Sequence, residues 1–92
     1  MDKNNKKMIN DLYEVIISLE DLKEAEAFLD DLCTHKEIEQ MAQRIAAARL
    51  LIDGKTYTQV IEETGISSAT LSRVSRCVKY GSGYNKVLNK NK

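Results

Sequence analysis

Residues 57–76 read YTQVIEETGISSATLSRVSR, and this stretch decides the fold. Its apolar residues recur at intervals of three and four, first before Gly65 and then at Leu71 and Val74, as on one face of a helix. Gly65 stands between the two sets, and glycine is the residue that best tolerates the positive φ angle of a tight turn. The pattern therefore predicts a helix-turn-helix over residues 56–79.

Short signals mark where the two helices of this motif begin. Thr56 and Gln59 have the T-x-x-Q spacing of a capping box. Ser67 is a favourable N-cap residue, so its hydroxyl is expected to accept a hydrogen bond from the backbone near Thr70. Ile66 lies between the helices and is expected to be buried at their joint. We therefore predict that one helix begins after Thr56 and the other after Ser67.

The rest of the chain shows the same helical spacing. It has 92 residues, 42% hydrophobic residues, no proline and four glycines, so turn residues are too few for a fold of many short strands. We predict an all-α fold of six helices in a single domain, residues 1–92. Outside the helix-turn-helix, the expected helices cover residues 7–19, 21–33, 35–53 and a short C-terminal segment, 84–90.

The first three expected helices carry more apolar surface than one small chain can cover. Leu12 and Ile16 in the first, Phe28 in the second and Ile45 in the third belong to these apolar faces. A chain of this size buries only about 60–65% of its surface on its own. We therefore predict that residues 1–53 are dimerisation helices of a homodimer, and a self-contained helical bundle is the alternative.

Charge is balanced over the chain but divided between its two parts. Residues 1–42 hold five lysines and eleven acidic residues, whereas residues 43–92 hold nine basic and three acidic residues. From Gly65 to the end there are six basic residues and no acidic one. Such a division favours an anionic partner for the second part, nucleic acid first, although solvated faces that happen to segregate would give the same pattern.

Other functional classes lack their signals. No apolar run approaches 18 residues and no secretory signal is present, so we expect a cytoplasmic protein without membrane contact. Cys33 and Cys77 are far apart with His35 as the one histidine, so we expect neither a metal site nor a cofactor. We expect no enzyme activity, because no phosphate loop and no nucleophile with a well-spaced base occur.

The second helix of the motif is expected to present small polar and basic side chains while Leu71 and Val74 stay buried. Hydroxyl, methyl and guanidinium groups suit the base edges and phosphates of a major groove. We therefore predict a sequence-specific transcriptional regulator that binds double-stranded DNA. The alternative is a helix-turn-helix module that contacts a protein component of the transcription machinery. The expected outward residues are Ser67, Ser68, Ala69, Thr70, Ser72, Arg73 and Arg76.

The stretch QRIAAARLLIDGKTYTQVIEETGISSATLSRVSRC, followed by VKYGSGYNKVL, resembles the Trp repressor superfamily, in particular its YerC/YecD-type branch. The resemblance covers about 34–88 and implies an intertwined homodimer of six-helix chains with two helix-turn-helix motifs, acting as a repressor. It also implies positions for DNA contact. Base-reading positions correspond to Thr58, Ser68, Ala69 and Thr70, phosphate-side positions to Ser72, Ser75 and Lys79, and Arg76 adds a charge.

The same resemblance implies an effector pocket. Thr34 matches one pocket residue, and Arg44 and Arg73 match the two arginines that enclose the indole ring of L-tryptophan in the repressor. Val74 stands where the repressor has glycine, and Cys77 where it has serine. We expect the Val74 side chain to fill the space between the arginines, and we therefore predict that the protein does not respond to L-tryptophan.

Overall fold

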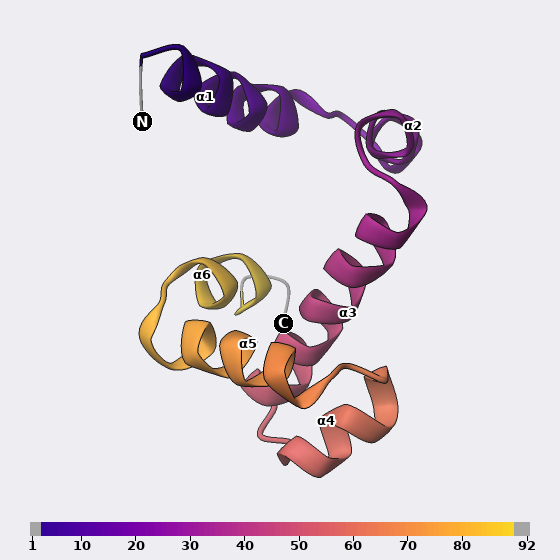
Figure 1. Cartoon of the computed structure of the whole chain (residues 1–92), viewed down its shortest axis with the longest axis vertical. Coiled ribbons are helices and arrows are strands. Elements are labelled where there is room, and N and C mark those ends of the chain that lie inside the picture. The colour runs from indigo at the N-terminus through magenta and orange to yellow at the C-terminus, as the bar shows by residue number, and fades with distance from the viewer. Residues whose placement is uncertain (1–2, 90–92) are drawn as a thin grey trace. The chain divides into compact units, whose positions relative to one another are not determined.

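The computed structural model describes residues 3–89, which form six α-helices and no strand (Figure 1). The predicted all-α, six-helix fold is thereby confirmed. The predicted end of the last helix, Lys90, lies outside the described residues. The helices are α1 (Lys3–Ser18), α2 (Leu22–Leu32), α3 (His35–Ile52), α4 (Tyr57–Thr64), α5 (Ser68–Tyr80) and α6 (Gly83–Asn89).

Most helix ends lie within one or two residues of the predicted positions, and local polar groups explain them. Asp21 is the N-cap of α2, because its Oδ1 accepts a hydrogen bond of 2.8 Å from the Glu24 backbone N–H. The start of α1 differs most, since the helix begins at Lys3 and not near residue 7. Its first turn is polar, so apolar spacing could not reveal it.

The chain forms two compact units, Met1–His35 and Lys36–Lys92, called here the N-terminal and the C-terminal unit. The N-terminal unit contains α1 and α2, and none of its residues from 4 to 35 is buried. Ile17 and Leu22 are 83% and 81% exposed although both are large and apolar. The N-terminal unit therefore has helices with apolar side chains but no core of its own.

The C-terminal unit is built around a single hydrophobic core. Its helix α5 contacts both α4 and α6 (Figure 1). Two alanines of α3 are fully buried in the same core. Small alanine side chains allow α3 to lie close to its neighbours. The buried core consists of Ala47, Ala48, Val60, Ile66, Leu71, Val74 and Leu88.

The boundary between the two units, after His35, falls inside the predicted dimerisation segment, residues 1–53. The sequence interpretation grouped α3 with α1 and α2, whereas within one chain α3 contributes Ala47 and Ala48 to the core of the C-terminal unit. The role of residues 1–53 in dimerisation and the single-domain organisation therefore stay predictions. Within residues 3–89, no helix has both the length and the apolar composition needed to span a bilayer.

Candidate nucleic-acid interface

The first helix of the motif, α4, begins at the predicted capping box. The Thr56 hydroxyl oxygen accepts from the Gln59 backbone N–H at 3.2 Å, and the Gln59 Oε1 accepts from the Thr56 backbone N–H at 2.9 Å. The helix ends at Gly65, whose φ of +73° is the left-handed conformation expected of it. The Gly65 N–H donates to the Ile61 carbonyl at 2.8 Å, which closes the last turn.

The second helix, α5, also begins as predicted. Ser67 is its N-cap, and its hydroxyl oxygen accepts from the Thr70 backbone N–H at 3.2 Å. The same hydroxyl donates to the Thr70 side-chain oxygen at 2.9 Å. Ile66 is buried between the helices. Tyr57–Thr64 and Ser68–Tyr80 are therefore two helices joined by a short turn at Gly65, within the segment where the helix-turn-helix was predicted.

The outward face of α5 carries most of the residues predicted to contact nucleic acid. Side chains of hydroxyl, methyl and basic type lie exposed along it, and no acidic residue occurs from Gly65 to the end of the chain. This surface can donate hydrogen bonds to base edges and place positive charge near phosphates. The exposed residues of the predicted set are Thr58 on α4 and Ser67, Ser68, Ala69, Ser72, Arg73, Arg76 and Lys79.

Two predicted contact residues are less accessible than expected. Ser75 is only 4% exposed, because it follows Leu71 by four positions and therefore lies on the core side of α5. Its burial argues against a phosphate contact, so we leave Ser75 out of the interface proposed below. Thr70, in the first turn of α5, is half-buried and lines a cavity beside α3.

Tyr80 is exposed on the same face and was missed by the sequence interpretation. It follows Arg76 by four positions and Arg73 by seven, so helical geometry places all three on one side of α5. Its side chain is 84% exposed at the end of the helix. The spacing of Arg73, Arg76 and Tyr80 along one helix is the signal in the sequence that points to it.

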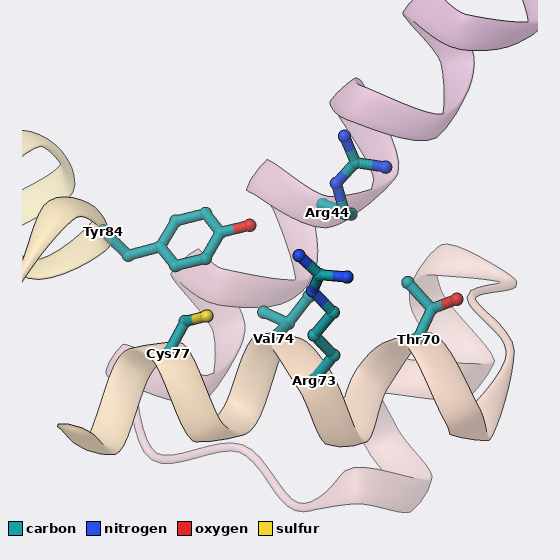
Figure 2. Close-up of a pocket in the computed structure, with 6 residues that line it drawn as sticks. All are labelled: Arg44, Thr70, Arg73, Val74, Cys77 and Tyr84. Atoms are coloured by element: carbon teal, nitrogen blue, oxygen red, sulfur yellow. The ribbon is translucent and has the colours of Figure 1, made fainter. Parts of the chain in front are cut away.

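A cavity of about 420 Å³ lies beside this face, between α3, α5 and α6 (Figure 2). Arg44 and Arg73 both line it, as the resemblance implied. No acidic residue is among its lining residues, so the cavity can accept an anionic group. Its lining residues are Arg44, Thr70, Arg73, Val74, Cys77 and Tyr84.

Val74 lines this cavity between the two arginines. Its side chain is 1% exposed and belongs to the core. The expectation that Val74 fills the space between the arginines stays a prediction. Thr34, the remaining residue of the implied pocket, belongs to the N-terminal unit, and its role stays a prediction.

Tyr84 is the cavity residue that sequence reasoning missed. Figure 2 shows its ring extending from α6 toward the side where Arg44 and Arg73 lie. A hydrogen bond of 2.6 Å from the Asn85 Nδ2 to the Val78 carbonyl links α6 to α5 next to this ring. Within the described residues, no group of three or more His, Cys, Asp or Glu side chains is arranged to hold a metal ion.

Comparisons with known proteins agree with this geometry. The family model described as Trp repressor protein matches residues 7–92. The uncharacterised protein YerC of Bacillus subtilis is 49% identical over 81 residues, which are 88% of this chain and 78% of YerC.

Two solved structures share the fold. A TrpR-like protein from Eubacterium eligens has a TM-score of 0.87 and 41% identity, covering 91% of this chain and 88% of its own. A candidate Trp repressor from Staphylococcus aureus has a TM-score of 0.87 and 34% identity, covering 98% and 94%. The chain therefore belongs to the Trp repressor family, which indicates a helix-turn-helix regulator that binds DNA.

Proposed function

We propose that the protein is a sequence-specific transcriptional repressor that binds double-stranded DNA as a homodimer in the cytoplasm. The observation that carries this proposal is the exposed, acid-free outward face of α5 directly after the glycine turn. In a helix-turn-helix, the second helix enters the major groove with its N-terminal residues toward the bases. Two copies would bind half-sites separated by about one helical turn of DNA.

The proposed contacts divide along α5. Ser68 and Ala69 lie in its first turn, where they would approach base edges. Arg73 and Arg76 follow on the same outward side and would bind phosphates. Tyr80 lies about 18 Å along the helix from Ser68, farther than the groove is wide, so its hydroxyl would also contact the DNA backbone.

The homodimer is supported by the exposed apolar side chains of α1 and α2. Short helices in water gain most of their stability from packing of an apolar face. The N-terminal unit offers such faces, with Leu12 and Ile16 one helical turn apart on α1, yet buries none of its described residues. A second copy of the chain would cover them, and it would bring two α5 helices onto one DNA duplex.

We further propose that binding of DNA does not require L-tryptophan. Val74 adds apolar atoms to the cavity between Arg44 and Arg73, and Cys77 offers a thiol, which is a weak hydrogen-bond partner. Tyr84 already supplies an aromatic ring of the chain itself at this place (Figure 2). An indole ring would have to share the cavity with that phenol.

Selection of bound sequences from a random pool of DNA duplexes tests the proposal, followed by a salt titration on the selected duplex. The double change Arg73→Ala and Arg76→Ala should leave helicity intact. It should lower the slope of log affinity against log salt by about one to two, because each lost phosphate contact releases about one counterion fewer.

The matched control removes two positive charges elsewhere in the C-terminal unit. Arg49 and Lys86 are both exposed, on α3 and α6, and neither belongs to the proposed interface. Changing both to alanine should leave the salt slope close to that of the unmodified protein. An equal fall in slope for both pairs would contradict the proposed role of α5, and so would an unchanged slope after loss of Arg73 and Arg76.

A further inference from the structure

A side chain of α3 is hydrogen-bonded to the turn of the helix-turn-helix. Gln43 on α3 donates from its Nε2 to the Thr64 carbonyl over 3.0 Å, across 21 positions of the chain. Both residues are partly buried. A Cβ added at Gly65 would lie 3.6 Å from the same nitrogen, so the amide also lies against the backbone of the turn.

The accepting carbonyl is one that the motif itself leaves without a helical partner. Thr64 is the last residue of α4, and the final carbonyls of a helix have no N–H within the helix to bind. Two further polar groups of the turn are satisfied locally. The Thr64 hydroxyl donates to the Val60 carbonyl at 2.7 Å and accepts from the Ile66 N–H at 3.2 Å. The bond from Gln43 therefore links the turn to α3 through a carbonyl that α4 itself cannot satisfy.

Apolar packing alone would leave the orientation of this turn relative to α3 less well defined. Ile66 and Leu71 attach the motif to the core, but hydrophobic contacts are not directional, whereas a hydrogen bond is. Beside the Gln43 bond, residues of α3, the turn and the start of α5 line a hollow of about 370 Å³. The side chains there leave open space, so the hydrogen bond supplies a directed contact on this side.

We propose that Gln43 is a positioning residue that fixes the orientation of α5 for base recognition, an inference that rests on the proposed DNA binding. The N-cap Ser67 follows Thr64 by only three residues, so a shift of the turn is passed directly to Ser68 and Ala69. Base contacts require close hydrogen-bond geometry, while phosphate contacts tolerate small displacements. Loss of the bond should therefore weaken recognition of sequence more than attraction to DNA in general.

The test replaces Gln43 with methionine, which is similar in length and helix propensity but donates no hydrogen bond. Affinity is measured for the duplex obtained by selection and for a scrambled duplex. We expect a loss of about three- to tenfold on the selected duplex only, the equivalent of one net hydrogen bond. The salt slope should not change, and the Gly65 and Ile66 amide protons should exchange faster with solvent.

Gln40→Met is the matched control, because Gln40 lies one turn earlier on α3 and lines the same hollow. It should behave as the unmodified protein does. If Gln43→Met melts below the assay temperature, Gln43→Asn replaces it, since it keeps the amide but is too short to reach Thr64.

Equal losses on both duplexes, or no loss, would overturn the role of Gln43 while leaving the proposed function intact. An unmodified protein that binds neither duplex would overturn the proposed function itself.

Discussion

The two units of the chain cover their apolar side chains in different ways. In the C-terminal unit, Val60 and Leu71 are completely buried and the core joins four helices. In the N-terminal unit, the described part of the chain buries no residue, and Leu22 is 81% exposed. The C-terminal unit has the packing that stabilises a fold, whereas the N-terminal unit needs packing from another surface. This difference agrees with the proposal that the C-terminal unit binds DNA and the N-terminal unit forms the homodimer.

The largest effect is expected from a charge placed on the apolar face of α1. Ile16→Asp should weaken the homodimer by at least about 100-fold, because an unpaired charge buried at an interface costs about 3–5 kcal/mol. Sedimentation velocity across a concentration series measures the change. Asn10→Asp adds the same charge at an exposed polar position of α1 and should leave assembly unchanged. A dimer that survives Ile16→Asp would show that this face of α1 is not the contact.

The second test compares one substitution in both units. Leu71→Ala should lower the free energy of unfolding by about 2–5 kcal/mol, because it opens a cavity in the core. Leu22→Ala removes the same atoms from a side chain that is exposed within one chain, and it should cost less than about 1 kcal/mol when unfolding is measured on the dissociated monomer. Urea unfolding followed by circular dichroism gives both values. Equal losses of unfolding free energy for the two variants would contradict the inferred difference in packing between the units.

The third test uses the helix caps, which both units possess. Thr56→Ala removes the capping box of α4 and should cost about 1 kcal/mol of stability in the main unfolding transition. Asp21→Ala removes the cap of α2 and should reduce helix content in the N-terminal unit. Its effect on the main transition should be smaller, since that transition reports the core. Calorimetry and circular dichroism on the same samples separate the two results.

The smallest effect is expected from L-tryptophan, which should change nothing. Isothermal calorimetry should give no heat at micromolar concentrations, and affinity for the selected duplex should be equal with and without the amino acid. Val74→Gly is the informative variant, because it enlarges the space beside Arg44 and Arg73. Binding of L-tryptophan by the unmodified protein would contradict the proposal and would show that the Tyr84 ring can give way.

Local features of the fold could be predicted from the sequence. The capping box at Thr56, the left-handed Gly65 and the N-cap Ser67 each depend on residues at most a few positions away. Their hydrogen bonds follow from side-chain type and spacing, so a single sequence contains the required information. The buried positions Leu71 and Val74 followed from helical spacing in the same way.

Features that depend on distant residues could not be predicted. Ser75 follows the buried Leu71 by four positions, but how far burial extends around α5 depends on the elements that pack against it in the C-terminal unit. The bond from Gln43 to Thr64 joins residues 21 positions apart, and nothing local to either indicates the other. The volume of the cavity beside Val74 depends on how far apart α3, α5 and α6 lie, which the spacing within one helix does not give.

The hydroxyl of Ser67 has a consequence for how recognition can change during evolution. This hydroxyl caps α5 by accepting from the Thr70 backbone N–H, and it also donates to the Thr70 side-chain oxygen. A substitution of Ser67 or Thr70 should therefore disturb the start of the helix. Ser68, Ala69 and Ser72 are exposed and take no part in this cap. On the proposed interface, substitutions at these three positions should change the DNA target at little cost to the fold, whereas substitutions at Ser67 or Thr70 should also lower the stability of α5.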